Sequence, residues 1–424
     1  DPVPGSDEMT VEFFPNRPDM YSVEGIARAM RAFLGIEPGL KEYAVEDSDI
    51  EAVVTPGVKE IRPYFMCAAV FGVDVDDTAL RSMMEMQEKL HITVGRKRSK
   101  LAIGIHDLDK VTPPFTFEAV DPDRFSFVPL AKTEKMTMRE ILEKHEKGRA
   151  YAHLMDGMEK FPVILDAKGN VLSFPPIING ALTTVTTSTR NLFVDVTGFD
   201  EGAVEECVNI VTTALAERGG TIRRVHMEGA PKESYPNLEP RTMTVSLKEC
   251  GRFVGVDFTP EQAVEALGRM GLGAECDGDR LTVRIPAYRM DFLHDADVYE
   301  DVAIGYGFDN YGKKRHDVTQ TFGKLLPETS FSEKVKDIMI GLGYTELTTL
   351  TLSNKRDEFE ISGLPEVDAV TVKNPITEEH TCLRSYLMPS LMKILRHNKH
   401  RDLPQKIFEV GFVIRDAKTV LHLC

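Results

Sequence analysis

Four acidic side chains in the segment 286–307 are spaced so that they could bind a metal ion. Asp297, Glu300 and Asp301 stand at positions i, i+3 and i+4, which places three carboxylates on one face of the helix expected there. Asp291 lies six residues earlier, where a strand leads into this helix. Mg²⁺ is a hard cation that prefers oxygen ligands and keeps several of its waters. The spacing therefore makes Asp291, Asp297, Glu300 and Asp301 a candidate magnesium site.

A structural interpretation of the same carboxylates is equally open. Acidic residues near a helix N-terminus complement the helix macrodipole and need no metal. Like charges at these spacings destabilise an isolated helix by roughly 0.2–0.5 kcal/mol per pair. Spacing alone does not decide between the two interpretations. The helix is expected to end at Gly305 and Gly307.

Asp195 is a second candidate, because it interrupts an apolar run over 191–198 that is typical of a buried strand. Side chains alternate along a strand, so Asp195 and Thr197 point to the same side. Burying a carboxylate without partners is costly. Asp195 is therefore either a structural carboxylate with its own hydrogen bonds or part of a binding pocket.

The composition limits the classes of protein that need to be considered. A chain of 424 residues is too long for one core and predicts about three domains. No window resembles a membrane span or the core of a signal peptide. The six cysteines show no zinc spacing and read as free thiols in a reducing cytoplasm. The net charge of −16 excludes a general electrostatic attraction to nucleic acid.

The order of the elements predicts a multidomain α+β protein. We expect an N-terminal segment over 1–60, an α+β module over 61–230, a helix-plus-hairpin module of winged-helix outline over 240–312, and a last module over 325–424. In the last module we expect a strand over 346–352 and a helix over 387–400. Since the chain begins with Asp1 rather than Met and ends within an apparent strand, we expect a fragment cut at both ends.

Several stretches, taken together, resemble the beta subunit of phenylalanine–tRNA ligase. The acidic segment does so through Pro286, the run Tyr288-Arg289-Met290-Asp291, then Asp297 and Glu300-Asp301. In that family these acidic positions bind magnesium at the contact with the alpha subunit, which implies Mg²⁺ as the cofactor here. The last position is more often Glu in bacterial relatives. Asn16-Arg17-Pro18-Asp19 resembles another signature of the family, one that packs the fold.

The last module resembles the class II synthetase-like module of the same subunit. The resemblance is carried by Asn374-Pro375-Ile376-Thr377, by Leu383-Arg384, and by the run 406–411. That run is similar to a class II motif in which an arginine grips ATP two residues before the glutamate. Here the position holds Ile407, so no guanidinium fork is available for bidentate phosphate binding. The resemblance implies a module of catalytic shape that is inert in amino-acid activation.

The region 61–230 resembles the editing module of this family, which hydrolyses tyrosine wrongly attached to tRNA(Phe). The stretch Asp195-Val196-Thr197-Gly198 is similar to part of the pocket in archaeal and eukaryotic-type subunits. The resemblance implies that Asp195 and Thr197 belong to the editing pocket. More weakly matched positions of the same pocket are Leu165, Ser173 and Asn179. Where relatives often carry a serine after Asn179, this chain has Gly180.

The resemblance implies partners as well as an activity. An alpha subunit would activate phenylalanine with ATP in an α₂β₂ assembly, and tRNA(Phe) would be the nucleic acid bound, with no DNA and no membrane. The basic end of the helix over 387–400 is either an RNA or subunit contact or a solvated face. Two other functions stay open: a free-standing aminoacyl-tRNA deacylase, and a non-enzymatic nucleic-acid-binding protein. The class II-like signatures oppose the first, and the acidic charge opposes the second.

Overall fold

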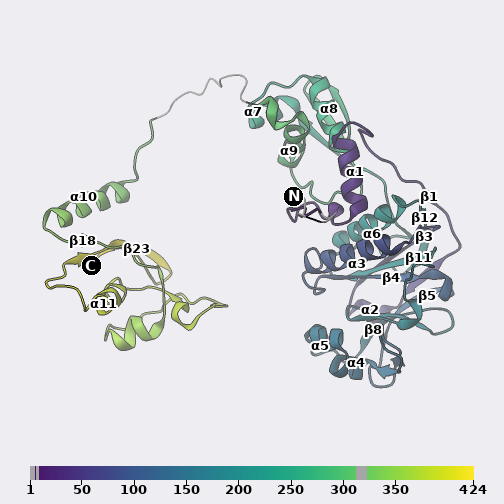
Figure 1. Cartoon of the computed structure of the whole chain (residues 1–424), viewed down its shortest axis with the longest axis horizontal. Helices are drawn as coiled ribbons and strands as arrows, with labels where there is room; N and C mark the ends of the chain where they lie inside the picture. Colours follow the sequence, from purple (N-terminus) through teal and green to yellow (C-terminus); the bar gives the residue numbers. More distant parts are fainter. Residues whose placement is uncertain (1–4, 6–8, 312–321) are drawn as a thin grey trace. The chain divides into compact units, whose positions relative to one another are not determined.

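The structure is a computed structural model that describes residue 5, residues 9–311 and residues 322–424. The chain forms two compact units, Asp1–His316 and Asp317–Cys424 (Figure 1). Each unit combines helices with small sheets, so the predicted α+β architecture is confirmed. In the described part of the chain, no helix is long and apolar enough to cross a membrane.

A five-stranded sheet forms the centre of the first unit. Its strands, in spatial order, are β1 (Val45–Glu46), β12 (Thr221–Arg223), β3 (Tyr64–Phe71), β11 (Leu192–Gly198) and β4 (Leu101–Asp107). Every residue of β11 and β4 is buried, as expected for strands covered on both faces. Helices α3 (Asp77–Ile92) and α6 (Glu201–Ala216) pack on this sheet (Figure 1).

A seven-stranded sheet covers the other face of the first. It runs in the order β10 (Ile178–Asn179), β9 (Val171–Phe174), β8 (Phe161–Leu165), β5 (Phe115–Val120), β2 (Glu51–Val54), β13 (Val225–Glu228) and β14 (Ser234–Tyr235). The two sheets meet through aromatic pairs. Phe193 of β11 lies 4.2 Å from Phe115 of β5 between ring centroids. Because side chains alternate, Asp195 shares the inter-sheet face with Phe193.

A three-stranded sheet with three helices forms another part of the first unit. The strands β15 (Arg241–Ser246), β17 (Arg280–Ile285) and β16 (Gly273–Asp277) are antiparallel, and β16 and β17 form the hairpin predicted for this module. The helices are α7 (Leu247–Val254), α8 (Pro260–Arg269) and α9 (Asp295–Tyr306). Gly305 does not end α9. A Cβ at Gly305 would lie 2.0 Å from the Ala266 carbonyl oxygen, so glycine is needed where α9 crosses α8.

The second unit is built from short strand pairs and two longer helices, α10 (Pro327–Gly341) and α11 (Met388–His397). The paired strands are β18 (Thr345–Glu346) with β21 (Ile407–Phe408), β19 (Leu352–Ser353) with β20 (Cys382–Leu383), and β22 (Val410–Arg415) with β23 (Lys418–Leu423). The predicted strand over 346–352 is wrong, since its two ends pair with different partners and its middle pairs with none of the described strands.

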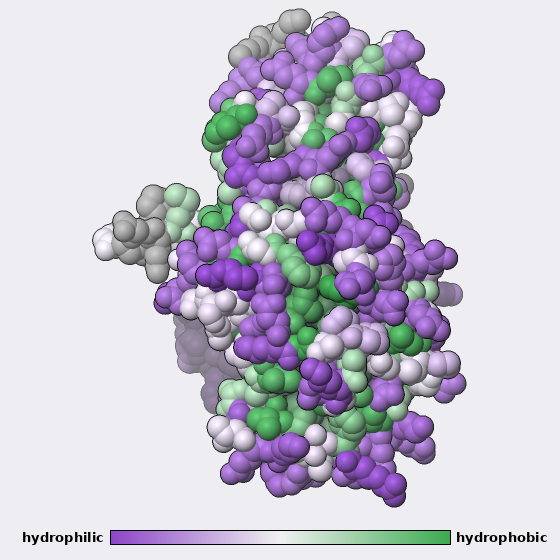
Figure 2. Space-filling view, turned by 90° about the vertical axis from the view of Figure 1, so that its right-hand side faces the viewer, coloured by the Kyte–Doolittle hydropathy of each residue, from purple (hydrophilic) through white to green (hydrophobic). Residues whose placement is uncertain are grey.

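Polar residues dominate the face of the first unit seen in Figure 2, and apolar residues appear between them in smaller groups. Of the six cysteines, all free, Cys424 is exposed and Cys276 is partly exposed, while the other four are buried.

Buried ion pairs lie on both sides of the junction between the N-terminal segment and the module that carries α9. The Arg289 guanidinium lies 2.7 Å from an Asp291 oxygen and 2.9 Å from an Asp301 oxygen. Asp19, which is 2% exposed, accepts two hydrogen bonds from Arg17 at 2.8 and 2.9 Å. Burial opposes ionisation of Asp19, but the charges of Arg17, Arg289 and Arg28 together hold its pKa below the usual value.

An aromatic contact strengthens the same junction. Arg28, from helix α1 (Val23–Phe33), lies 3.7 Å from the centre of the Tyr288 ring and donates a hydrogen bond to Tyr43 at 3.2 Å. Cation–π contacts of desolvated guanidinium groups are worth about 2 kcal/mol. The two stretches 16–19 and 286–291, almost 270 residues apart in sequence, thus form one buried cluster.

We expect Arg289→Met to destabilise the first unit strongly, by about 3–5 kcal/mol, because it leaves buried carboxylates without a counter-charge. Urea unfolding followed by circular dichroism measures this change. Adding Asp301→Asn to Arg289→Met should recover part of the loss, since it removes the stranded charge.

The matched control for this prediction is Arg284→Met, which breaks the exposed 2.8 Å pair between Arg284 and Glu42. Exposed pairs are worth about 0–1 kcal/mol, so this variant should unfold almost as the unchanged chain does. Equal losses for Arg289→Met and Arg284→Met would contradict a structural role of the buried cluster.

Candidate functional site

Asp195 lies at the middle of β11, between β3 and β4, and is 1% exposed. In the register of the sheet it stands opposite Cys67 of β3 and Gly104 of β4. Its Oδ2 atom lies 2.7 Å from Nε2 of His106, a fully buried residue of β4. No hydrogen bond to the other oxygen, Oδ1, is described for residues 9–311 and 322–424.

His106 connects Asp195 to a third polar side chain. Its Nδ1 atom lies 2.7 Å from the hydroxyl of Thr183, which is also buried. Thr183 belongs to a short 3₁₀ helix over Ala181–Thr183, directly after β10. Buried polar groups are stable when they are hydrogen-bonded to one another. Asp195, His106 and Thr183 therefore form one continuous chain of hydrogen bonds inside the apolar core.

Gly104 makes room for this chain of hydrogen bonds. A Cβ atom at this position would lie 2.0 Å from Asp195 Oδ2 and 2.6 Å from His106 Nε2. Real Cβ atoms essentially never approach other heavy atoms so closely. Any residue other than glycine would thus push the carboxylate or the imidazole out of place.

Asp195 lines a cavity of about 290 Å³, close to the lower end of the volumes typical of small-ligand sites. The sheet contributes Ala102, Ile103 and Gly104 to its wall, and β9 to β10 contribute Ser173 and the run 175–179. Polar side chains from other elements also border the cavity: Gln87, His91, Arg98, His145, Glu146 and Lys147. The cavity thus combines an apolar wall with a few polar groups, the usual character of a site that holds a small molecule.

Arg98 reaches the cavity from a strained turn. Arg96, Lys97 and Arg98 all have positive φ, at 47°, 54° and 68°. Each such non-glycine residue costs roughly 1–2 kcal/mol. The Arg98 guanidinium donates to the Pro176 and Ile177 carbonyl oxygens at 3.3 and 3.0 Å. Strained backbone of this kind persists where the surroundings hold it, and it often marks a functional site.

His91 supplies a neutral imidazole to the same wall. Burial lowers the pKa of His91, although the Glu88 carboxylate opposes this shift. Its Nε2 atom accepts the Ile103 backbone N–H at 2.8 Å, so the proton of the neutral ring is on Nδ1. His91 therefore serves to hold the edge of β4 in place.

The structure brings three of the five predicted pocket residues to the cavity and places two elsewhere. Asp195, Ser173 and Asn179 line the cavity, and the Ser173 hydroxyl donates to Asn179 Oδ1 at 3.2 Å. Thr197 accepts a 2.8 Å hydrogen bond from the buried Arg62 and is absent from the cavity wall. Leu165 packs against the apolar cluster beneath β8 and β9.

The sequence reasoning missed His106, Thr183 and Arg62. Arg62 belongs to the surroundings of Asp195 because the two charges interact: burial lowers the pKa of Arg62 to about 9, and the negative charge of Asp195 opposes this fall. His106 lies 89 residues from Asp195 in sequence and meets it through the sheet, while Thr183 and Arg62 lie outside the strands. The one available signal for His106 was its place in the run 101–107, which alternates as a buried strand does.

The four carboxylates of the acidic stretch do not gather around one point, contrary to our expectation. Asp291 and Asp301 both face Arg289, while Asp297 accepts the backbone N–H groups of Leu293 and His294 at 2.6 and 2.7 Å. Glu300 is exposed. Among the described residues no group of three or more His, Cys, Asp or Glu side chains could hold a metal ion. As the chain is folded, these residues fit an ion pair and a helix cap rather than Mg²⁺.

In the second unit, the acidic residue of the run 406–411 has an internal partner. Glu409 lies 2.8 Å from Arg384 and accepts the Thr349 hydroxyl at 2.7 Å, with both charged residues buried. Ile407 pairs with Thr345 across β21 and β18 and brings no positive charge. The guanidinium nearest to this glutamate is therefore engaged within the unit.

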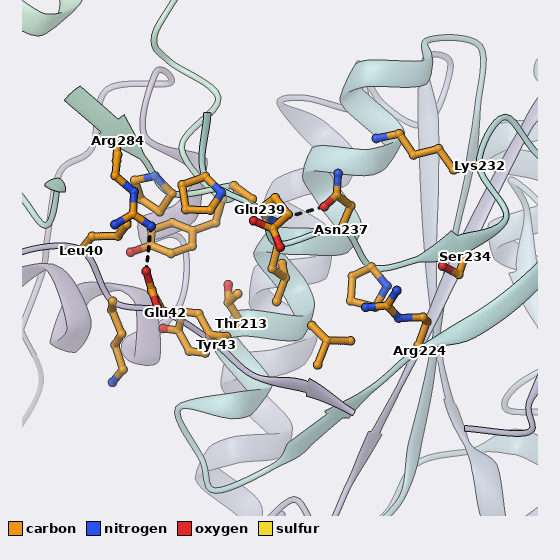
Figure 3. A pocket seen from close by; sticks show the side chains of 18 of the residues that line it. Leu40, Glu42, Tyr43, Thr213, Arg224, Lys232, Ser234, Asn237, Glu239 and Arg284 are labelled. Carbon is orange, nitrogen blue, oxygen red and sulfur yellow. Dashed lines mark hydrogen bonds and ion pairs between the residues drawn. The ribbon is translucent and has the colours of Figure 1, made fainter. Parts of the chain in front are cut away.

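A larger hollow of about 490 Å³ lies elsewhere in the first unit, where residues 40–45, 232–240 and 284–288 meet (Figure 3). Some of its charged side chains are paired: Arg284 pairs with Glu42, and Lys232 pairs with Glu205. Polar groups of both signs line this hollow. The cavity at Asp195 differs from it in having a buried carboxylate in its wall.

Comparisons with known proteins match three successive parts of the chain. Residues 79–215 match the B3/4 domain, residues 243–308 match the tRNA synthetase B5 domain, and residues 314–421 match the phenylalanyl-tRNA synthetase beta chain CLM domain. The cavity and Asp195 lie in the first match, and α9 lies in the second.

The similarity to individual proteins extends over almost the whole chain. The phenylalanine–tRNA ligase beta subunit of Methanothrix thermoacetophila is 47% identical over 99% of this chain and 78% of its own length. The beta subunit of Methanosarcina acetivorans is 49% identical over 97% of this chain and 76% of its own length.

A solved structure supports the same relationship. The N-terminal fragment of the phenylalanyl-tRNA synthetase beta subunit from Pyrococcus horikoshii superposes with a TM-score of 0.67 at 42% identity, covering 69% of this chain and 85% of that fragment. The sequence motifs, the family matches and the fold thus agree. The chain belongs to the family of phenylalanine–tRNA ligase beta subunits.

Proposed function

We propose that this chain works with an alpha subunit that activates phenylalanine with ATP, in an α₂β₂ assembly that charges tRNA(Phe). We further propose that the cavity at Asp195 removes tyrosine from mischarged Tyr-tRNA(Phe). The observation that carries the second proposal is the free Oδ1 atom of a buried carboxylate in the wall of a cavity of about 290 Å³.

The carboxylate supplies a basis for choosing tyrosine over phenylalanine. A tyrosine hydroxyl can donate a hydrogen bond to Asp195 Oδ1, while apolar residues of the wall, such as Ile103 and Ile178, would face the ring. Phenylalanine would fill the same space and leave the carboxylate oxygen unpaired. Sites that are built to bind a hydroxyl reject the analogue lacking it by about 10⁴–10⁵.

Hydrolysis in this cavity would use water as the nucleophile. The Ser173 hydroxyl donates to Asn179, and the hydrogen bonds described for the cavity include none between Ser173 and a histidine. Without such a pair a serine is a weak nucleophile at neutral pH. Water would attack the ester carbonyl carbon, the bond to the ribose oxygen would break, and tyrosine and the free tRNA hydroxyl would leave. Exposed polar groups that border the cavity, such as Lys147, would orient the tRNA end.

We expect Asp195→Ala to destroy discrimination between the two esters. The ratio of kcat/KM for Tyr-tRNA(Phe) to that for Phe-tRNA(Phe) should fall by at least about 100-fold, since the hydrogen bond to the hydroxyl and the penalty for its absence are both lost. Hydrolysis of each purified ester by the assembled enzyme measures the ratio, and phenylalanine charging should stay nearly unchanged.

The control for this experiment is Asp47→Ala, which removes an exposed carboxylate paired with His226 at 2.9 Å on the same unit. It should leave both hydrolysis rates unchanged. An unchanged ratio in Asp195→Ala would place the editing pocket elsewhere in the chain.

We also expect the chain alone to form no aminoacyl-adenylate. The guanidinium closest to Glu409 belongs to Arg384, which already binds Glu409, Thr349 and the Phe412 carbonyl oxygen. The Arg384 guanidinium is therefore not available there for bidentate binding of ATP phosphates. Phenylalanine-dependent exchange of pyrophosphate into ATP should be absent for the chain alone and should appear when the alpha subunit is added. Exchange by the purified chain would contradict this assignment.

A further inference from the structure

His106 is the partner that determines how Asp195 presents its carboxylate. The nearest buried cation, Arg62, donates to the Thr197 hydroxyl and carbonyl oxygen at 2.8 and 2.7 Å rather than to Asp195. In the described part of the chain, the carboxylate of Asp195 has one hydrogen bond, which is to His106. A buried carboxylate in contact with one donor takes its orientation from that donor.

The hydrogen bonds from Thr183 to His106 and from His106 to Asp195 limit where the proton of the imidazole can lie. A neutral imidazole has one N–H and one acceptor nitrogen. The Thr183 hydroxyl lies 2.7 Å from His106 Nδ1 and 3.4 Å from the Gly180 carbonyl oxygen, so His106 is the closer of its two acceptors. With the hydroxyl proton directed at Nδ1, the proton of the ring is on Nε2 and is donated to Asp195 Oδ2 at 2.7 Å. In this arrangement Asp195 accepts through Oδ2, and Oδ1 is left as an acceptor for a ligand of the cavity.

The surroundings hold the imidazole in this position. His106 is fully buried, and its ring centroid lies 6.3 Å from that of Phe193 on the neighbouring strand. The absence of a side chain at Gly104 gives the ring and the carboxylate the space in which they meet. A side chain that is fixed by packing and by a hydrogen bond at each nitrogen can position a second residue accurately.

We propose that His106 is a positioning residue for substrate specificity: by donating to Asp195 Oδ2, it fixes the carboxylate with Oδ1 directed at the hydroxyl of a tyrosyl ester. This inference rests on the editing function proposed above. Thr183 has a secondary role: by donating its hydroxyl proton to Nδ1, it favours the tautomer of His106 that carries its proton on Nε2. His106 itself does not contact the reacting ester.

The test compares two substitutions of His106 in the assembled enzyme. His106→Leu removes the donor, and the Tyr-to-Phe ratio of kcat/KM should fall by at least about tenfold, mainly through a higher KM for Tyr-tRNA(Phe). His106→Gln keeps an N–H donor at the end of the side chain and should recover most of the ratio. His226→Leu, which removes the exposed histidine paired with Asp47, is the matched control and should change nothing.

A double-mutant cycle separates positioning from a general effect on the fold. If His106 acts through Asp195, then His106→Leu should not lower the ratio further in an Asp195→Ala background. Should His106→Leu fail to fold, Thr183→Val removes the hydroxyl at the far end of the chain and should lower the ratio, while Thr183→Ser should restore it.

The outcomes distinguish this inference from the proposed function. If the unchanged enzyme releases no tyrosine from Tyr-tRNA(Phe), the editing function is wrong and the role of His106 falls with it. If the unchanged enzyme edits and His106→Leu, or Thr183→Val in its place, keeps the ratio, only the positioning role is overturned. A further loss in the Asp195→Ala background would also overturn it, because His106 would then act independently of Asp195.

Discussion

A buried positive charge, that of Arg289, limits how the first unit can fold. Once it is removed from water, a guanidinium needs carboxylates close to it, and the chain supplies Asp291 and Asp301 within 2.9 Å. Asp19, which comes from the other end of the unit, contributes to the same charge balance. The charge balance therefore favours docking of the N-terminal segment against the module that carries α9, where Arg28 also contacts Tyr288.

The same requirement operates at two other places in the chain. Asp195 is buried between two sheets and is satisfied by His106, while Glu409 is buried in the second unit and is satisfied by Arg384. At Arg289 and Arg384 the pairing is complete, so the groups are structural. At Asp195 one oxygen has no partner, and this difference separates the candidate site from the structural ion pairs.

Local patterns were enough to predict many elements but not the partners of the buried charges. The strand around Asp195, the hairpin turn at 277–279 and the helix α9 follow from alternation, turn residues and helical spacing. The pairing of Asp195 with His106 joins residues 89 positions apart, and periodicity does not carry such information. The same limit applies to Asp301, whose spacing suggested a metal ligand and whose counter-charge proved to be an arginine.

Gly104 has a consequence for how sequences of this family can vary. Because a Cβ there would lie 2.0 Å from Asp195 Oδ2, the two positions compete for the same volume. A relative with a larger residue in place of Gly104 would have to carry a smaller or differently oriented one in place of Asp195. The two positions are therefore expected to change together in an alignment, and a chain in which they have changed would have to recognise its aromatic substrate by a different group.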